Sequence, residues 1–382
     1  MRIGILTFHR SINYGAFMQS YALSQTLKKR YPNHTVEIID FEYLRKHNNY
    51  KNPPVRFPPF NIEYRIKYNR FQSSLSLLPL SKQTFITDNT EILCNYIRDN
   101  YDIVIVGSDA VWAFQKMQPD NPYWLFGPKL KNIIKMSYAA SAFSTRFDKV
   151  SEEEKEIIRE RLSDFTYIGV RDNATKEFVD SLHLNQEVYI NNDPTFFLEP
   201  SEDYNLYKKT LHKNLIFSNK KKIAFMTRTM PHIDELRKDL VSQYDLVHFN
   251  IRNRNKDILS TKCKFMPNLS PYEWYNAFGQ MSLTITNFFH GACLSIINHV
   301  PTIVIDDAKT PYTSKYSQLM YDLGLNDSLF NIKTLDYQEL SKHIHYLLSH
   351  QDQEKVKIEK AIQKERLKSQ SFFKKLDSIL IG

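Results

Sequence analysis

The feature that most constrains the fold is the alternation of short apolar runs with helix-like segments along most of the chain. Several of the runs, such as "IVIV" at residues 103–106, are apolar throughout instead of alternating with polar residues. Continuous apolar strands are typical of parallel sheets that helices cover on both faces. The sequence therefore predicts an α/β fold built from βα units. The expected strands are residues 2–7, 36–40, 102–107, 134–139, 167–170, 188–191, 222–227, 246–250, 282–286 and 302–306.

The stretch "NYGAFMQSYAL", which begins at Asn13, follows the first apolar run. We expect Gly15 to supply a tight turn and a helix to start near Ala16, with its backbone N–H groups available to a ligand. The helix should end at the basic run of residues 28–30, because positive charge is favourable there and Pro32 prevents continuation. A structural turn without a ligand is the alternative.

A chain of 382 residues exceeds the size at which a single core stops growing, so two domains are expected. Residues 199–222 are polar and charged, and we place the boundary there, with domains at residues 1–200 and 201–382. The second domain would end in a charged helical tail at residues 352–380. Residues 51–59 contain four prolines and form either a lid over a site or a plain surface insertion.

Composition narrows the classes of function. A formal net charge of +9 suits an anionic substrate, an anionic membrane surface or nucleic acid. Nucleic acid is not expected as a partner, because the chain has no dense Lys/Arg block and no nucleic-acid motif. The three cysteines form no C-x-x-C pair, so neither a zinc site nor a disulfide framework is expected. No apolar stretch approaches 18 residues, and we expect a cytoplasmic protein.

The most informative segment is residues 282–306, which has the pattern of strand, turn, helix, loop and strand. His290 and Gly291 fall at the turn into the helix, where free N–H groups and the positive end of the helix dipole favour an anion. The same dipole disfavours an imidazolium, so His290 should be neutral and able to exchange a proton with a substrate. A structural histidine at a helix start is the alternative.

Five motifs occur together and in order: "NYGAFMQSYAL", "VGSDAVW" at residue 106, "SYAAS" at 137, "GVRD" at 169 and "TNFFHGACLSIINHVPTIVI" at 286. With them the chain resembles the polysaccharide pyruvyl transferase family over most of its length. The resemblance implies two Rossmann-like domains facing a central cleft, as in glycosyltransferases of the B type. It also implies transfer of the pyruvyl group of phosphoenolpyruvate to sugar hydroxyls as a ketal, with release of phosphate.

The chain departs from the family pattern at three positions. Asn287-Phe288 stands where many relatives have an Arg or an Asp-Ser pair before Phe-His-Gly. Ser314-Lys315 stands in place of Ser-Arg, which keeps a positive charge but loses bidentate recognition. Ala110 replaces a glutamine and loses an amide.

The resemblance and the position of residues at strand ends together give the candidate site. His290 is the expected acid or base, and Asp109, at the end of "YDIVIVG", either receives a hydroxyl proton or caps the next helix. Arg171 either binds the donor or pairs with Asp172, and Arg228 and Lys315 either bind the donor or are ordinary structural and solvated side chains. Gly291 and Asn287 complete the donor set. The expected acceptor contacts are Asn13, Tyr14, Gly15 and Ser108, and Asp193 is expected to serve only a turn.

Three functions stay open at this point. The first is a pyruvyl transferase that needs neither a metal nor a cofactor beyond its substrate phosphoenolpyruvate. Its acceptor would be a glycan or lipid-linked oligosaccharide of a capsule, cell wall or exopolysaccharide, which suits a peripheral location at the inner membrane face. The second is a glycosyltransferase with a nucleotide-sugar donor, for which Asp306-Asp307 would grip the ribose. The third is an inactive carbohydrate-binding relative.

Overall fold

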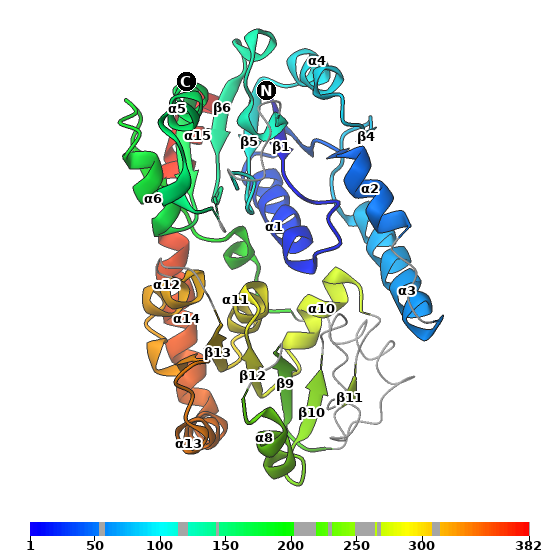
Figure 1. Cartoon of the computed structure of the whole chain (residues 1–382), viewed down its shortest axis with the longest axis vertical. Helices are drawn as coiled ribbons and strands as arrows, with labels where there is room; N and C mark the ends of the chain where they lie inside the picture. The colour runs from blue at the N-terminus through cyan, green and yellow to red at the C-terminus, as the bar shows by residue number, and fades with distance from the viewer. Residues whose placement is uncertain are drawn as a thin grey trace. The chain divides into compact units, whose positions relative to one another are not determined.

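The computed structural model describes residues 1–52, 58–113, 121–142, 145–201, 219–227, 231–248, 264–265, 269–307 and 314–381 (Figure 1). The chain divides into two compact units. The first contains Met1–Asn61, Phe71–Phe197 and Arg366–Gly382, and the second contains Ile62–Arg70 and Leu198–Glu365. Each unit is built around its own parallel sheet.

In the described part of the first unit, six strands form a parallel sheet in the order β2-β1-β5-β6-β7-β8. Strand β5 is buried along its whole length and β1 along all but its first residue, which explains why their sequences are apolar on both faces. A short parallel pair, β3 and β4, lies outside this sheet. The strands are β1 (Arg2–Leu6), β2 (Thr35–Ile38), β3 (Phe41–Glu42), β4 (Phe85–Ile86), β5 (Ile103–Val106), β6 (Ile134–Ser137), β7 (Phe165–Val170) and β8 (Val188–Ile190).

Four helices of the first unit, α1, α4, α5 and α6, begin at residues whose side chains cap the helix. The hydroxyl of Ser151 and the carboxylate of Glu154 form a capping box at the start of α5, and Asp172 caps α6. Helix α1 packs on β2, α5 on β7 and α6 on β8. The helices are α1 (Tyr14–Arg30), α2 (Leu44–Lys51), α4 (Thr90–Asn100), α5 (Glu152–Leu162) and α6 (Asn173–Asp180). Helix α3 (Pro58–Ser74) is divided, because its residues Ile62–Arg70 are assigned to the second unit.

The last helix, α15 (Gln370–Ile381), belongs to the first unit, whereas the sequence-based division placed residues 366–382 in the second domain. The ring of Phe372 is fully buried, with its centroid 4.7 Å from that of Tyr138 and 5.5 Å from that of Tyr167. The hydroxyl of Ser369 lies 2.7 Å from that of Tyr138. Burial of this aromatic face explains why the charged tail returns to the first sheet.

The described part of the second unit contains a parallel sheet in the order β11-β10-β9-β12-β13-β14. Helix α11 packs on β12 and β13, and α12 packs on β13 and β14. The elements are β9 (Lys222–Met226), α8 (Ile233–Leu240), β10 (Asp245–His248), β11 (Lys264–Phe265), α10 (Pro271–Phe278), β12 (Leu283–Thr286), α11 (Phe289–Ile297), β13 (Thr302–Asp306), α12 (Lys315–Asp322), β14 (Leu329–Asn331), α13 (Tyr337–Ser349) and α14 (Gln351–Leu367).

Strand order reverses once in each sheet, between β1 and β5 in the first unit and between β9 and β12 in the second. In open α/β sheets, ligands bind outside the carboxyl ends of the strands at such a switch point. All ten strands expected from the sequence are present, although the predicted residues 249–250 lie outside the described part of the chain, as do residues 53–57 of the proline-rich segment. The sequence did not predict β3, β4, β11 and β14, which are only 2 or 3 residues long.

Candidate functional site

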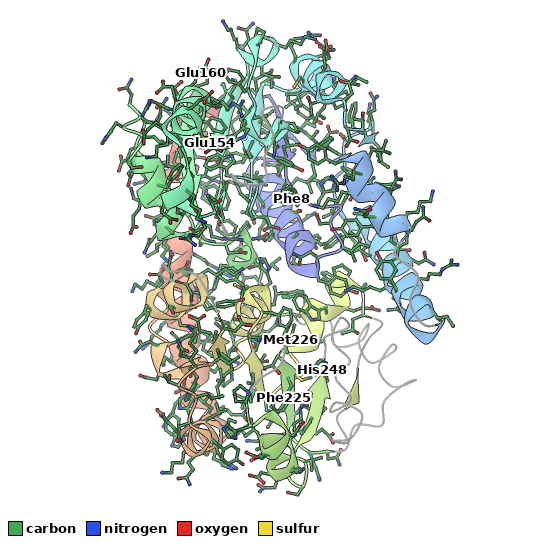
Figure 2. The ribbon with its side chains drawn as sticks, in the orientation of Figure 1. Phe8, Glu154, Glu160, Phe225, Met226 and His248 are labelled. Atoms are coloured by element: carbon green, nitrogen blue, oxygen red, sulfur yellow. The ribbon has the colours of Figure 1, made fainter. Side chains whose placement is uncertain are left out.

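The junction of β12 and α11 in the second unit has a tightly determined backbone. The Thr286 hydroxyl donates to the carbonyl of Met226 (3.1 Å) and accepts from the N–H of Phe288 (3.0 Å). The turn is thereby held against the end of β9, where Met226 lies (Figure 2). A Cβ atom on Gly291 would lie 2.8 Å from the Thr286 oxygen. The start of α11 can therefore approach the strand edge this closely only because residue 291 is glycine.

His290 is the second residue of α11 and is half-buried, with its ring in edge contact with Phe289 (5.2 Å between centroids). The N-cap residue, Phe288, has no side-chain oxygen to accept from the first N–H groups of the helix. The ammonium of Lys315 lies 5.2 Å from the centre of the Phe289 ring. The second unit thus gathers His290, Gly291 and Lys315 at one helix start that favours an anion.

Asn287 lies in the same turn, and its polar groups hold the turn together. Its side-chain amide donates to the carboxylate of Asp307 (3.0 Å), and its carbonyl accepts from the Tyr316 hydroxyl (3.0 Å). Its backbone N–H donates to the carbonyl of Met226 (3.1 Å). Binding of the donor substrate by Asn287 stays a prediction, whereas its hydrogen bonds show that it holds the turn in position. Arg228 lies outside the described residues.

Arg171 lies in the first unit, directly after β7, and its guanidinium is buried. It pairs with Asp193 (3.2 Å). The neighbouring Asp172 carboxylate caps α6 by accepting from the Thr175 N–H (2.9 Å). Asp193 is more than a turn residue, because it also accepts from the side-chain amide of Gln19 (2.5 Å). Donor binding by Arg171 would compete with this buried ion pair.

Ser108 and Asp109 follow β5 at the switch point of the first sheet. The Thr7 hydroxyl, after β1, donates to the Ser108 carbonyl (2.9 Å) and links the two strand ends. Asp109 has a φ of 89° and accepts from its neighbour's N–H, that of Ala110 (2.7 Å). No helix begins within residues 110–113, so helix capping by Asp109 is not observed in this stretch. The strained backbone conformation at this strand end is of a kind found at functional sites.

The turn expected at Gly15 is wrong in detail. Helix α1 begins at Tyr14, and Gly15 is its second residue, without a positive φ. The side chain of Asn13 caps the helix by accepting from the Gly15 N–H (3.0 Å). Asparagine is a preferred N-cap residue, so its presence just before the helix could have indicated this cap. Tyr14 is buried and stacked on Phe71, with 6.4 Å between ring centroids. Only Asn13 of the three is exposed, so it is the one available for contact with an acceptor.

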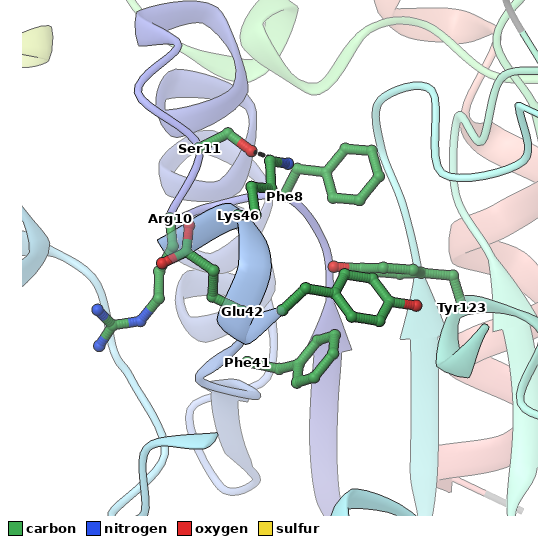
Figure 3. Close-up of a pocket in the computed structure, with 8 residues that line it drawn as sticks. Phe8, Arg10, Ser11, Phe41, Glu42, Lys46 and Tyr123 are labelled. Atoms are coloured by element: carbon green, nitrogen blue, oxygen red, sulfur yellow. Dashed lines mark hydrogen bonds between the residues drawn. The ribbon is translucent and has the colours of Figure 1, made fainter. Parts of the chain in front are cut away.

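A hollow in the first unit is lined by residues that the sequence analysis did not single out (Figure 3). It opens to solvent and has enclosed room for about one water-sized group. Its charged members are Arg10, after β1, Glu42 in β3 and Lys46 in α2. Polar residues directly after the first two strands were the available signal, because such positions lie at the ligand-binding edge of a parallel sheet. The lining residues are Phe8, Arg10, Ser11, Phe41, Glu42, Tyr43, Lys46 and Tyr123.

Asp40 holds the wall of this hollow in place. Its buried carboxylate accepts two hydrogen bonds from Arg10 (2.5 and 2.7 Å) and one from His9 (2.9 Å). Burial alone would raise the pKa of Asp40, but these hydrogen bonds outweigh burial and lower the pKa well below its usual range. The loop after β1 is therefore fixed by a charged network.

Lys46 is connected to Asp109 through charge. Burial lowers the pKa of Lys46, and the carboxylates of Asp109 and Glu42 oppose that effect. Its ammonium donates to the Ser11 hydroxyl (2.6 Å) and lies 4.4 Å from the centre of the Phe8 ring. The hollow and the end of β5 are thus parts of one polar region at the carboxyl edge of the first sheet.

Two further properties bear on the site. In the part of the chain that the structure describes, no three His, Cys, Asp or Glu side chains gather closely enough to hold a metal ion. Over the same residues, none of the helices is both long enough and apolar enough to cross a membrane.

Comparisons with known proteins identify the fold and the family. The chain superposes on UDP-GlcNAc 2-epimerase from Neisseria meningitidis bound to UDP-GlcNAc with a TM-score of 0.63 and 11% identity, covering 98% of this chain and 99% of the other. It also superposes on ADP-heptose lps heptosyltransferase II from E. coli, with a TM-score of 0.50 and 12% identity, covering 92% and 100%. These similarities confirm the B-type architecture of two Rossmann-like units.

No curated protein matches the sequence. The family model for polysaccharide pyruvyl transferase matches residues 13–308, which include the junctions after β5, β7 and β12. The match covers more than half of the chain and confirms the resemblance carried by the five motifs. The chain therefore belongs to the polysaccharide pyruvyl transferase family.

Proposed function

We propose that the protein transfers the pyruvyl group of phosphoenolpyruvate to sugar hydroxyls of a polysaccharide or glycan precursor, forming a pyruvate ketal and releasing phosphate. The observation that carries the proposal is the start of α11, where His290 and Lys315 lie at a helix N-terminus whose N-cap residue makes no side-chain hydrogen bond. Phosphoenolpyruvate carries a carboxylate and a phosphate, and a helix start with a nearby cation is suited to bind such groups. Family membership supplies the reaction class.

The proposed chemistry begins with proton transfer to the methylene carbon of phosphoenolpyruvate, for which His290 is the candidate acid. The neighbouring carbon becomes cationic, and a sugar hydroxyl attacks it while giving up its proton. A second hydroxyl of the same sugar then attacks the same carbon, the C–O bond to phosphate breaks, and the leaving phosphate takes up the proton of that hydroxyl. The two new C–O bonds form the ketal. Protonation activates the donor carbon in this scheme, so we propose a reaction without a metal or other cofactor.

The acceptor side is proposed to lie in the first unit. Asp109 is the candidate base for the hydroxyl proton, with Ser108 and Asn13 as acceptor contacts. The basic net charge suits an acceptor linked to lipid at an anionic membrane surface, which a cytoplasmic protein could reach without a spanning helix.

Thermal-shift measurements test the donor. Phosphoenolpyruvate should raise the unfolding temperature in a concentration-dependent way, because a ligand that binds only the folded state stabilises it. Lys315→Met should weaken this shift, whereas Lys333→Met, which removes the same charge from an exposed position of the second unit, should not. His290→Ala should abolish phosphate release in the presence of an acceptor and leave phosphoenolpyruvate binding measurable.

A nucleotide-sugar donor is the second candidate, because the superposed proteins include one bound to UDP-GlcNAc. The aspartates expected to grip ribose are already engaged, since Asp306 accepts from Ser317 (2.9 Å) and Asp307 accepts from Asn287 (3.0 Å). A thermal shift with nucleotide sugars and none with phosphoenolpyruvate would replace our proposal with this one. No shift with either, in a folded protein, would favour an inactive binding relative.

A further inference from the structure

A buried ion pair at the carboxyl edge of the first sheet contains Arg171, the candidate donor-binding cation of this unit. Arg171 directly follows β7, and Asp193 lies after β8, the neighbouring strand. Nη1 of Arg171 lies 3.2 Å from Oδ2 of Asp193, and the two side chains are 6% and 2% exposed. Because the buried guanidinium is already paired, an incoming anion has to compete with Asp193 for it.

The Asp193 carboxylate has further donors besides Arg171. Its Oδ1 atom accepts from the backbone N–H (3.1 Å) and the hydroxyl (2.7 Å) of Thr195. Its Oδ2 atom accepts from the side-chain amide of Gln19 (2.5 Å), which belongs to α1. The contact with Arg171 is the longest of these four hydrogen bonds. Hydrogen bonds to an ionised carboxylate are strong, so the other three continue to stabilise it when the guanidinium turns away.

The C-terminal part of the first unit holds the turn that carries Asp193. The Ser369 hydroxyl donates to the side-chain oxygen of Asn192, whose amide donates to the carbonyl of Asp193 (2.9 Å). Nε of Arg366 donates to the carbonyl of Phe196 in the same turn (2.6 Å). A short aspartate side chain on a fixed turn cannot follow a ligand, whereas its long arginine partner has many rotamers. The guanidinium is therefore the member of the pair that can turn.

A turn of the Arg171 guanidinium differs from its loss. The cation stays beside Asp193 when it turns, so the carboxylate keeps the field of a nearby positive charge. Helix α1, which supplies Gln19, begins at the same carboxyl edge after β1. Open α/β sheets bind ligands outside this edge, so an anion that arrives there meets the guanidinium on the side of the ligand.

We propose that Asp193 sets the affinity for the donor: it pairs with the Arg171 guanidinium while the donor is absent, and an anionic group of phosphoenolpyruvate takes its place on binding. Such an exchange lowers the apparent affinity by the fraction of molecules in which Arg171 is available. The inference rests on the proposed pyruvyl transfer, because it takes phosphoenolpyruvate as the ligand of Arg171.

Isothermal titration calorimetry of phosphoenolpyruvate against the full chain tests the exchange. Asp193→Asn removes the competing charge and should lower the dissociation constant about fivefold or more. The substitution can be accommodated, because Oε1 of Gln19 is buried without a hydrogen-bond partner among the described residues. A flipped Gln19 amide can therefore accept from the new side-chain amide. A purely structural Asp193 predicts the opposite sign, since a loosened turn would weaken binding.

Gln19→Leu should change the affinity in the other direction. It removes one donor from Asp193, which then depends more on Arg171, so the dissociation constant should rise about threefold or more. Asp164→Asn is the matched control. Asp164 pairs with the buried Lys135 (3.0 Å) and directly precedes β7, at the amino edge of the same sheet. The affinity of this control should equal that of the wild type.

The outcomes separate this inference from the proposed function. If phosphoenolpyruvate binds the wild type, and binds Asp193→Asn equally or more weakly with the variant folded by circular dichroism, the exchange is refuted and pyruvyl transfer stands. If phosphoenolpyruvate binds neither protein, both proposals are rejected. Should Asp193→Asn fail to fold, Gln19→Leu decides, because binding as tight as that of the wild type or tighter contradicts the exchange.

Discussion

Replacing Gly107 with alanine should be among the most damaging small substitutions in the first unit. Gly107 directly follows β5 and has a φ of +113°, and an added Cβ would lie 2.2 Å from the carbonyl oxygen of Tyr138. That oxygen belongs to the backbone directly after β6, so it cannot move aside as a flexible side chain would. Gly127 provides a matched control, because its φ is +118° and no atom lies within 4 Å of its added Cβ.

The comparison separates strain in the dihedral angle from steric overlap. A residue forced into such a φ costs about 1–3 kcal/mol, and this cost applies to both variants. Overpacking adds about 1–3 kcal/mol for Gly107 alone. We therefore expect Gly127→Ala to lower the free energy of unfolding by about 1–3 kcal/mol and Gly107→Ala by about 2–6 kcal/mol, with the larger loss for Gly107→Ala.

Urea unfolding followed by tryptophan fluorescence measures the difference. Two of the three tryptophans, Trp112 and Trp124, lie in the first unit and stack with 5.7 Å between centroids. A Trp274→Phe background removes the tryptophan of the second unit, so the signal reports the first unit alone. Equal losses for Gly107→Ala and Gly127→Ala, within about 0.5 kcal/mol, would refute the steric argument.

The remaining predictions concern three other parts of the first unit. Phe372→Ala should lower the free energy of unfolding by about 3–5 kcal/mol in a urea titration, because it leaves a cavity at a fully buried position. A loss under about 1 kcal/mol would contradict the packing of α15 on the first unit. Arg171→Met should lower the free energy of unfolding by about 3–5 kcal/mol, because it leaves the buried Asp193 carboxylate without its cation. The double variant Arg171→Met with Asp193→Leu should recover much of this loss. If Arg171→Met instead abolishes phosphoenolpyruvate binding without changing stability, Arg171 binds the donor. The folded-state pKa of Asp40 lies below its unfolded value, so its contribution is present above about pH 4 and declines as pH falls through the folded-state pKa. Asp40→Asn should therefore destabilise the protein most at neutral pH, with a smaller difference from wild type at low pH in a thermal-unfolding series.

The candidate residues of the second unit illustrate what local sequence can predict. A strand, a Phe-His-Gly turn and a helix are adjacent in the chain, so the position of His290 at a helix start follows from the local pattern. The requirement for glycine at residue 291 is less local, because it arises from a contact: a Cβ atom there would lie too close to the Thr286 side chain. The local sequence pattern predicts the turn between β12 and α11, and packing against Thr286 explains why residue 291 is glycine.

The candidate residues of the first unit show where local reasoning fails. Arg171 stands next to Asp172 in the sequence, yet its buried partner is Asp193. The strand direction and the start of α6 direct the two neighbouring side chains to different partners. Arg171 and Asp193 are 22 positions apart, and two residues so distant in the sequence cannot be paired from periodicity alone.

The sequence by itself determined the fold class and the family, because strand periodicity, helix signals and five ordered motifs are local properties that survive without coordinates. Only the tertiary structure decided that the terminal helix joins the first unit and that Glu42 and Lys46 face one hollow with Phe8. Glu42 lies in β3, Lys46 in α2 and Phe8 in the loop after β1, so these three residues meet only through the tertiary fold. Such contacts between residues distant in the sequence form because they bury the Phe372 ring and pair buried charges. Neither effect leaves a periodic pattern in the sequence.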